Sequence, residues 1–314
     1  MPEALGKRFG DLDAVTDMAP TDIIAISTEN GSKKITFQDL CTAVKELLSI
    51  PTVVDSIDIS ESGKIPDGPV IKKTFDDLLN PIMEAATYAG KEIEMSWAEL
   101  SAKIKTEDFT GLHLGDYKDI TLTTGEEARV ELSGFNTYLN TGDTNILTAP
   151  HLVFTFRDCL ETTYQMNTTN TNVGGYAASA LAETVNTTIF NTLPADLRAV
   201  IREVRRLDNN KGTWEWKSWK LWLLKETEVF GRNNWSDGYD GQGIQLPIFA
   251  YSYRHIVKGL GKGAAERGSR ASWWLASPRA SNSTAFCIVD GYGYANYYHY
   301  ASTSYGVAPG FIIT

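Results

Sequence analysis

The sequence of 314 residues predicts an α+β fold. Segments with the amphipathic period of helices lie in its first two thirds, and the remainder consists of short strand-like runs separated by Gly, Ser and Asn. Helices followed by many short strands are typical of α+β proteins, whereas α/β proteins alternate strand and helix regularly. The length predicts about two domains, and the apolar content is sufficient for a real core.

The first 85 residues are predicted to form a small strand-turn-strand-helix module with a linker. Residues 1–20 carry mixed charge without a sustained period, which is typical of a weakly ordered arm. Two strands follow, "TDIIAIS" and "KKITF", joined at Asn30 and Gly31, because these residue types tolerate the positive φ of tight hairpin turns. The segment 51–73 is rich in Pro, Gly and Ser and predicts a linker. Between the second strand and this linker a helix is predicted, with one apolar stripe formed by Leu40, Val44, Leu47 and Leu48.

The second domain, residues 86–314, is predicted to begin with helices and a sheet. The segment "TFDDLLNPIMEAATYAG", which leads into this domain, and the segment "MSWAELSAKIKTEDFTGL" are predicted to be helical. Ser96 followed by Glu99 has the spacing of a capping box for the second helix. Residues 115–138 alternate like two strands joined by a Thr-Gly-Glu turn, and "PHLVFTFRDC" extends their sheet.

Two helices and several short strands complete the second domain. An amphipathic helix begins near residue 175, breaks at Pro194 and is followed by a second helix. Four residues share one face of that second helix, namely Leu197, Val200, Ile201 and Val204. The segment "KLWLLKETEVFG" contains a strand-like apolar run, and three further segments are predicted to be short strands, namely "RASWWLASP", "TAFCIVD" and "YGVAPGFIIT".

Charge and cysteine content exclude several classes of protein. A net charge of −10 disfavours a nucleic-acid partner, whose phosphates would be repelled. The three cysteines, Cys41, Cys159 and Cys287, are far apart and flanked by apolar residues, so we expect small buried side chains and no disulfides. The start lacks a secretory signal and no window is apolar enough for a membrane helix, so we expect synthesis in the cytoplasm and no membrane insertion.

The motifs of cofactor, metal and nucleophile sites are absent from the sequence. There is no glycine-rich nucleotide-binding pattern, and the four histidines stand singly. Asp237 and Asp240 lie in "SDGYDGQG", but the glutamate that closes a calcium loop is missing. Nothing near Cys159 would activate a thiolate. We therefore expect no cofactor, no metal and no catalytic residues.

A tyrosine-rich stretch, "DGYGYANYYHYASTSYG", occupies residues 290–306. Burying it would leave many hydroxyl groups without partners, and only Asp290 and His299 could serve as acid or base near neutral pH. Tyrosine mixed with Ser, Gly and Asn is the composition of antibody combining loops, because Tyr supplies a large, rigid contact and the small residues adapt. The stretch therefore predicts a binding surface.

Five runs in the C-terminal half then suggest a family: "LWLLKETEVFG", "LPIFAYSYRHIVKGLG", "SWWLASP", "FCIVDGYG" and "GVAPGFII". In this order they resemble the C-type-lectin-like variable proteins of diversity-generating retroelements, a group that includes phage receptor-binding proteins of the major tropism determinant type. The resemblance spans residues 90–314 and implies a C-type-lectin-like (formylglycine-generating-enzyme-like) domain over 86–314, with a variable repeat at about 273–314. The acidic-Pro-Asn loop of sugar-binding lectins and the paired cysteines of the oxidase branch are absent, so the resemblance concerns architecture.

In that family an error-prone reverse transcriptase randomises adenines, and randomised AAC codons never encode Lys, Gln, Glu, Met or Trp. None of these residue types occurs between Arg279 and Tyr305, although they are common elsewhere in the chain. The apolar anchors expected to be buried are Trp273, Trp274, Leu275, Phe286, Cys287, Val289, Val307, Pro309, Phe311 and Ile312, with small residues at Gly293, Ala295, Ala301 and Gly306. The ligand-binding residues expected to project outward are Arg279, Ala280, Ser281, Ser283, Ala285, Ile288, Asp290, Tyr292, Tyr294, Asn296, Tyr297, Tyr298, His299, Tyr300, Ser302, Thr303 and Tyr305.

The resemblance implies a diversified, non-enzymatic receptor-binding protein of a phage or prophage, located on the tail fibre or another exposed part of the virion. Its hypervariable surface would bind a host-cell-surface protein or glycan and so set host tropism. The module of residues 1–85 would attach it to other virion or tail proteins. Phage relatives suggest a homotrimer, although some relatives are monomeric.

Two alternatives remain open from the sequence. One is a carbohydrate-active enzyme of the cell envelope, with an aromatic sugar groove and a carboxylate pair drawn from Asp237, Asp240 and Asp290. The tryptophans of "TWEWKSWKLWLL" could line such a groove, although buried packing is the favoured interpretation for them. The other is a virion decoration protein without a receptor.

Overall fold

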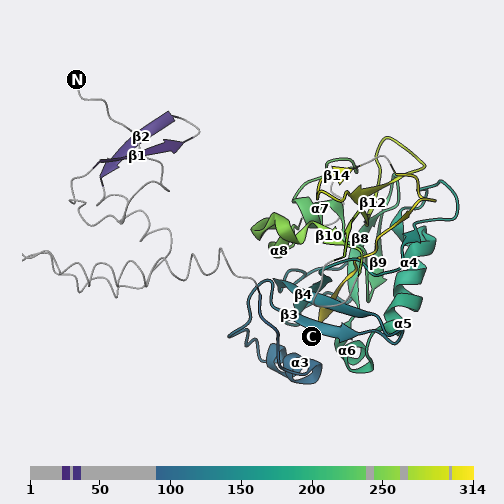
Figure 1. Cartoon of the computed structure of the whole chain (residues 1–314), viewed down its shortest axis with the longest axis horizontal. Coiled ribbons are helices and arrows are strands. Elements are labelled where there is room, and N and C mark those ends of the chain that lie inside the picture. Colours follow the sequence, from purple (N-terminus) through teal and green to yellow (C-terminus); the bar gives the residue numbers. More distant parts are fainter. Residues whose placement is uncertain (1–22, 29–30, 37–89, 238–243, 262–267, 297–298) are drawn as a thin grey trace, which may run out of the picture. The chain divides into compact units, whose positions relative to one another are not determined.

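A computed structural model describes residues 23–28, 31–36, 90–237, 244–261, 268–296 and 299–314 (Figure 1). The chain divides into two compact units, Met1–Thr87 and Tyr88–Thr314. The described residues contain both helices and strands, and strands predominate. None of their helices has the length and hydrophobicity needed to cross a membrane.

The first unit contains an antiparallel hairpin of β1 (Ile23–Thr28) and β2 (Gly31–Thr36). This confirms the two strands, but Thr28 pairs with Gly31, so Gly31 belongs to the second strand and is not in the turn. The predicted arm, linker and helices before residue 90 lie outside the described residues.

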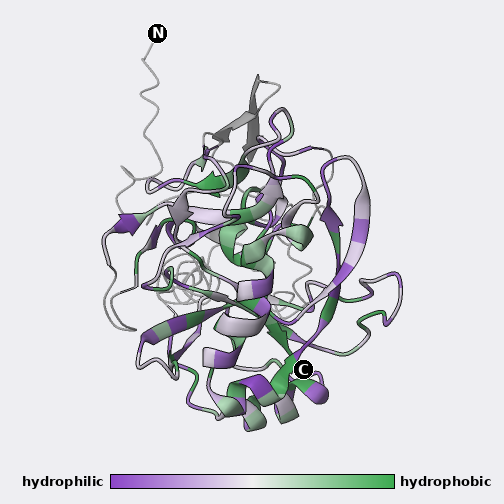
Figure 2. Ribbon diagram, turned by 90° about the vertical axis from the view of Figure 1, so that its right-hand side faces the viewer, coloured by the Kyte–Doolittle hydropathy of each residue, from purple (hydrophilic) through white to green (hydrophobic). Residues whose placement is uncertain are grey.

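A five-stranded antiparallel sheet with the order β3-β4-β5-β16-β7 organises the second unit. Its C-terminal strand lies between two strands from earlier in the chain, and all four of its residues are buried, in keeping with their hydrophobicity (Figure 2). The predicted strand pair and its extension by "PHLVFTFRDC" are confirmed. The strands are β3 (Tyr117–Thr121), β4 (Glu127–Phe135), β5 (Leu152–Phe156), β16 (Gly310–Ile313) and β7 (Ile201–Arg202).

A three-stranded antiparallel sheet, β12-β13-β14, carries most of the anchors predicted in the C-terminal region. Its strands are β12 (Trp273–Pro278), β13 (Phe286–Val289) and β14 (Ala295–Asn296). Three further antiparallel pairs are β8 (Val204–Asn209) with β9 (Trp214–Trp219), β10 (Lys258–Gly259) with β11 (Arg270–Ala271), and β6 (Tyr164–Gln165) with β15 (Ser304–Tyr305).

The helices of the second unit are short. The predicted capping box is present, because the Ser96 side chain accepts from the Glu99 amide and the Glu99 side chain accepts from the Ser96 amide. The α-helices are α3 (Trp97–Lys105), α4 (Ala180–Thr184), α5 (Phe190–Thr192), α6 (Ala195–Val200), α7 (Glu226–Phe230) and α8 (Pro247–Tyr251). A π-helical turn (Val185–Ile189) joins α4 to α5, and two 3-10 turns cover Tyr176–Ala178 and Tyr253–His255.

Two predictions of secondary structure were wrong. The helix after Pro194 ends at Val200, and Ile201 and Val204 lie in β7 and β8, because Ile201 pairs with Ile313 of the C-terminal strand. The strand-like apolar run of "KLWLLKETEVFG" is not a strand, since it makes an isolated bridge between Trp222 and Gly310. The residues after it form α7, which is capped by Gly231 with a left-handed φ of 71°. The apolar run itself, Leu221–Leu224, is fully buried in the core.

Candidate ligand-binding face

The tyrosine-rich stretch lies at the end of the second unit that carries β14, opposite α3 and the C-terminus (Figure 1). It runs from the end of β13 through β14 to β15, and loops connect these strands. A group of short loops on a sheet is a common setting for binding residues, because the sheet fixes the backbone.

Thirteen of the seventeen predicted ligand-binding residues reach the surface, and we call them the tyrosine-rich face. The exposed ones are Ser281, Ser283, Tyr292, Tyr294 and Tyr300. The half-buried ones are Arg279, Ala280, Asp290, Asn296, His299, Ser302, Thr303 and Tyr305. Tyr297 and Tyr298 lie outside the described residues.

The expectation that Ala285 and Ile288 project outward was wrong, because both are buried. Ile288 lies in the middle strand of the β12-β13-β14 sheet, opposite Trp274 on one side and Asn296 on the other. Every residue of this strand is buried, so neither face of the sheet is open there. A continuous apolar run such as "FCIV" is consistent with burial on both faces.

The ten predicted anchors, from Trp273 to Ile312, are all buried, which confirms that part of the interpretation. Gly306 is also buried, and a Cβ atom there would lie 2.5 Å from Sγ of Cys159. Cys159 and Cys287 are buried as predicted, whereas Cys41 lies outside the described residues. The backbone under the face is therefore held by a core in which a larger residue at 306 would clash.

The Asn172 side chain stabilises the loop 279–285 through hydrogen bonds to its backbone. Its buried side-chain nitrogen donates to the carbonyl oxygens of Asn282 and Ala285 at 2.7 Å each and of Arg279 at 3.2 Å. Its backbone amide donates to the carbonyl oxygen of Ser283 at 2.8 Å. All these contacts go to main-chain oxygens, so they do not depend on which side chains the loop presents.

Asp290 shapes the turn that presents two exposed tyrosines. Its Oδ1 accepts from the amides of Tyr292 at 2.9 Å and Tyr294 at 3.0 Å. Gly293 sits in this turn with φ of 88°, a left-handed value that favours glycine. The Asp290 carboxylate therefore stabilises the turn. Of its two candidate partners for a catalytic pair, Asp237 is exposed and Asp240 lies outside the described residues.

Trp235 lies in a loop, directly before the segment "SDGYDGQG". The buried carboxylate of Glu226 accepts from the amides of Trp235 at 3.0 Å and Ser236 at 2.9 Å, and from the Ser236 hydroxyl at 2.7 Å. The Trp235 indole donates to the carbonyl oxygen of Ala295 at 3.2 Å. The side chain, 38% exposed, thus lies at the edge of the face.

Tyr253 borders the face from another side. Its hydroxyl donates to the carbonyl oxygen of Tyr292, and its ring centroid lies 6.3 Å from that of Tyr294. Burial raises the pKa of Tyr253, so the hydroxyl keeps its proton and remains a donor. A Cβ atom at Gly293 would lie 2.6 Å from this hydroxyl oxygen, so only glycine leaves room for it.

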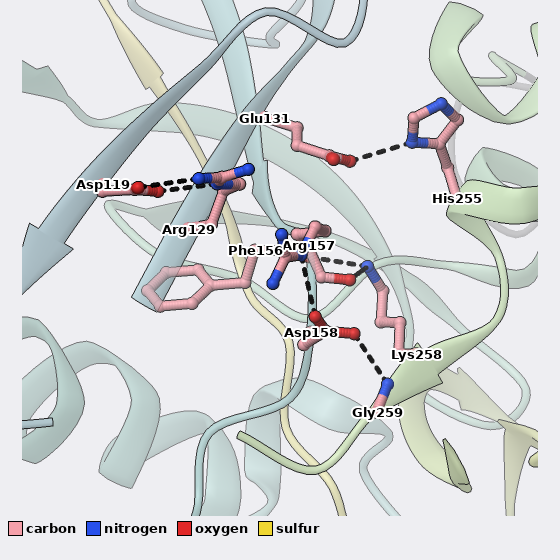
Figure 3. Close-up of polar contacts among 9 residues, drawn as sticks. All are labelled: Asp119, Arg129, Glu131, Phe156, Arg157, Asp158, His255, Lys258 and Gly259. Carbon is pink, nitrogen blue, oxygen red and sulfur yellow. Dashed lines mark hydrogen bonds and ion pairs between the residues drawn. The ribbon is translucent and has the colours of Figure 1, made fainter. Parts of the chain in front are cut away.

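A buried polar cluster fixes the segment that follows Tyr253 (Figure 3). His255 Nδ1 lies 2.9 Å from Oε2 of Glu131 on β4. Lys258 Nζ donates to the carbonyl oxygens of Phe156 at 2.6 Å and Arg157 at 3.1 Å, beyond the end of β5. The five-stranded sheet therefore positions the segment that follows Tyr253, the residue that borders the tyrosine-rich face.

Asp158 completes this cluster. It accepts from Nε of Arg157 at 2.8 Å and from the amide of Gly259 at 2.7 Å, as Figure 3 shows. The Arg129–Asp119 pair in the same view joins β4 to the edge strand β3. Arg157, His255 and Lys258 are buried and hydrogen-bonded, which is typical of a structural network, whereas the Arg129–Asp119 pair lies nearer the surface.

His299 and Tyr305 form a pair within the face. Their rings meet edge to face with centroids 4.7 Å apart, and the Tyr305 hydroxyl is hydrogen-bonded to Nδ1 of His299. Burial lowers the pKa of His299 below its ordinary value of 6.5, whereas Asp290 opposes the shift. Burial also raises the pKa of Tyr305, so at neutral pH the hydroxyl is the donor and the neutral imidazole the acceptor.

Other candidate sites lie apart from the face. A cavity of about 380 Å³ opens between the β3–β4 turn, the segment 160–164 and the end of the π-helical turn, and no residue of the tyrosine-rich face lines it. Of the clustered tryptophans, Trp222 is buried as predicted, but Trp214 is exposed. Among the described residues, no three acidic, histidine or cysteine side chains are grouped so as to hold a metal ion.

Four residues of the site were not identified from the sequence: Asn172, Glu226, Trp235 and Tyr253. Trp235 and Tyr253 lie in "RNNWSDG" and "YSYRH", where an aromatic residue beside Asn, Ser or Gly is the same signal as in the tyrosine-rich stretch. Asn172 carries no local signal, because its partners in the loop 279–285 are more than a hundred residues away. Glu226 lies only nine and ten residues before its partners Trp235 and Ser236, but that spacing matches no motif.

Comparison with known proteins gives one match. A family model described as a domain of unknown function (DUF6273) matches residues 146–314, which is more than half of the chain. The matched span contains the whole tyrosine-rich face, together with Asn172, Trp235 and Tyr253. No curated protein and no solved structure matches the chain.

Proposed function

The chain belongs to the DUF6273 family, and we propose that it is a diversified binding protein of the kind encoded by diversity-generating retroelements. In this proposal the second unit has a C-type-lectin-like fold and presents its tyrosine-rich face to a receptor on a host-cell surface. The protein is carried on a phage or prophage particle, and the first unit attaches it to other virion proteins.

One observation carries this proposal: the exposed tyrosines contribute little to holding their own backbone. Tyr292, Tyr294 and Tyr300 are 68%, 65% and 53% exposed. The backbone around them is held by other side chains. Asn172 donates to a main-chain carbonyl oxygen, and Asp290 accepts from the amides of Tyr292 and Tyr294. Side chains in such positions can be exchanged without unfolding the domain, which is the property that a diversified receptor-binding surface requires.

The architecture supports the same proposal. The C-terminal strand pairs inside the five-stranded sheet, so the end of the chain is anchored while the segment before it forms the face. A curled, mainly antiparallel sheet with a separate loop-bearing sheet is compatible with a C-type-lectin-like fold. The lack of Lys, Gln, Glu, Met and Trp between Arg279 and Tyr305 agrees with randomised AAC codons in this segment.

Binding to intact bacterial cells tests the proposed function. The full chain is labelled and titrated against a panel of candidate host strains, together with a variant carrying Tyr292→Ala, Tyr294→Ala and Tyr300→Ala. We expect saturable binding to one or more strains and a loss of at least about tenfold in affinity for the variant, because exposed tyrosines are typical interface hot spots. Ile146→Ala, which removes an exposed apolar side chain between β4 and β5, serves as the control and should bind normally.

A genomic observation tests the diversification separately. We expect a near-copy of the final coding segment close to the gene, with adenines at the codons for the exposed face, beside a reverse transcriptase gene. The tyrosine codons should also differ among sister strains while the anchor codons stay the same. Fixed tyrosine codons without a nearby template would overturn the proposal.

A further inference from the structure

Trp235 and Tyr253 precede the segment Arg279–Tyr305 in the sequence, yet both side chains donate hydrogen bonds to its backbone. The indole nitrogen of Trp235 donates to the carbonyl oxygen of Ala295. The hydroxyl of Tyr253 donates to the carbonyl oxygen of Tyr292. Each acceptor is a main-chain atom. Exchanging the side chain at 292 or 295 therefore leaves both hydrogen bonds in place.

Both aromatic side chains are also open to solvent beside the exposed tyrosines. Trp235 is 38% exposed and Tyr253 is 49% exposed. The Tyr253 ring faces that of Tyr294 at a centroid distance of 6.3 Å. A ligand that covers Tyr292 and Tyr294 would therefore reach Tyr253 as well.

The surrounding structure holds the two residues firmly. Glu226 accepts from the amides of Trp235 and Ser236, so the backbone of the tryptophan is fixed by a buried carboxylate. Ile256, three residues after Tyr253, accepts a hydrogen bond from the indole of buried Trp273 at 3.1 Å. Rigid aromatic residues lose little conformational entropy when they bind a partner.

We propose that Trp235 and Tyr253 form a constant aromatic rim, which contacts every ligand of this face whatever residues occupy the variable positions, and that these ligands are folded protein surfaces. This inference rests on the proposed function. Trp and Tyr are the residue types most enriched among interface hot spots, and they act best when neighbouring contacts exclude water. The rim then supplies shared affinity, and the tyrosine-rich face supplies specificity.

The shape of the surface favours a protein over a small sugar. The aromatic groups come from the segment before β14, the loop of Trp235 and the 3-10 turn of Tyr253. The cavity of about 380 Å³ is lined by other residues. Small ligands bind in concave sites that enclose most of their surface, whereas protein partners bind across broad, open surfaces. Exposed aromatic residues that come from three separate segments fit the second case.

Two display libraries of the full chain test the rim. Both randomise positions 281, 283, 292, 294 and 300, which are exposed, and one also carries Trp235→Ala and Tyr253→Ala. Each library is selected against hen egg-white lysozyme as a protein probe and against chitohexaose as a soluble glycan probe. We expect lysozyme binders from the library with the intact rim, and a loss of about tenfold or more in affinity when the two alanines are placed in those binders.

The outcomes separate the two proposals. Lysozyme binders that arise equally often and bind equally tightly without the rim would overturn the rim and leave the proposed function standing. Chitohexaose binders in place of lysozyme binders would overturn the protein class of the ligand. If neither library yields a binder to any probe, the proposed function fails and the rim fails with it.

A second measurement covers the case in which the alanine variants do not fold. Hydroxyl-radical footprinting compares free and lysozyme-bound forms of several independent binders with the intact rim. We expect oxidation of Trp235 and Tyr253 to fall in every complex, while Tyr117 on β3, at the other end of the unit, stays equally reactive. Unchanged oxidation of the rim in the complexes would overturn the inference.

Discussion

The side-chain nitrogen of Asn172 lies 2.7 Å from the carbonyl oxygen of Ala285, 113 residues further along the chain. The same nitrogen also reaches the carbonyl oxygens of Arg279 and Asn282. One buried amide thus fixes the loop 279–285, which carries part of the tyrosine-rich face. The conformation of this loop is set by a residue that has no need to vary.

Replacing Asn172 should destabilise the second unit. Asn172→Ala removes one buried donor that three carbonyl oxygens share, although Lys211 still donates to that of Arg279 and the Arg279 amide to that of Ala285. We therefore expect the free energy of unfolding to fall by about 1–3 kcal/mol. Asn172→Asp should be worse, because a carboxylate would face three carbonyl oxygens. Urea denaturation monitored by tryptophan fluorescence measures both. Asn170→Ala, which removes an exposed contact to Ser302, should change stability little, and an equal loss in the two alanine variants would contradict the assignment.

Gly306→Ala should disturb the packing under the face. The added Cβ atom would meet Sγ of Cys159 at 2.5 Å and its Cβ at 2.9 Å, both buried. Overpacking of this kind costs about 1–3 kcal/mol, which thermal unfolding would detect as a lower melting temperature. Gly291→Ala is the matched control, because its Cβ atom would have no neighbour closer than 3.7 Å. A normal melting temperature for Gly306→Ala would show that the contact relaxes without cost.

Breaking the buried pair of Arg206 and Glu228 should be costly. The two side chains are 2.6 Å apart and buried, and the Tyr138 hydroxyl donates to the same carboxylate oxygen at 2.6 Å. Arg206→Met leaves a buried carboxylate without its cation, so we expect a loss of about 3–5 kcal/mol. A variant with both Arg206→Met and Glu228→Leu should lose less than the sum of the single changes.

The neighbouring pair of Arg205 and Asp143 provides the control for that comparison. It has a similar geometry, with Nε of Arg205 2.8 Å from Oδ1 of Asp143, but it lies at the surface. Water screens such pairs, so Arg205→Met should have a small effect on urea denaturation. Comparable losses at the buried and the exposed pair would contradict the role of burial.

Stability should decrease at alkaline pH. Burial raises the pKa of Cys159 from 9.0 to about 12, and it also raises the pKa values of Tyr138 and Tyr176. The unfolded chain releases these protons at lower pH than the native protein does, so the native state binds more protons. The free energy of unfolding therefore falls as the pH rises from about 9 toward 12.

Urea denaturation at a series of alkaline pH values measures this dependence. Cys159→Ala removes one of the three groups, so its free energy of unfolding should fall less steeply over the same range. The thiol of Cys159 should also resist iodoacetamide in the native protein, because the thiolate is the reactive form. A slope identical to that of the unchanged protein would show that Cys159 does not contribute.

Local patterns were sufficient to predict much of the scaffold. The Ser96–Glu99 capping box and the strand pair 117–135 rely on neighbours within a few residues, and the structure contains both. The anchors around the tyrosine-rich stretch are large apolar side chains, whose burial follows from the hydrophobic effect alone. Composition likewise indicated which segment would form the exposed face.

Where partners are distant in sequence, local patterns failed. Ile201 and Val204 have the spacing of a helix face, but pairing with the C-terminal strand, over a hundred residues away, draws Ile201 into a sheet. Ala285 and Ile288 alternate with anchors, yet neighbours cover both faces of their strand. A short stretch of sequence does not show which distant residues will pair with it or cover it.

The sequence by itself determined a mixed fold with an apolar C-terminal core and a tyrosine-rich segment unsuited to burial. Only the tertiary structure decided which side chains in that segment reach the surface, and that Asn172, Glu226, Trp235 and Tyr253 meet it from elsewhere in the chain. The physical reason is that exposure and hydrogen bonding depend on what packs against a residue. For this face, the packing partners come from segments tens to more than a hundred residues away.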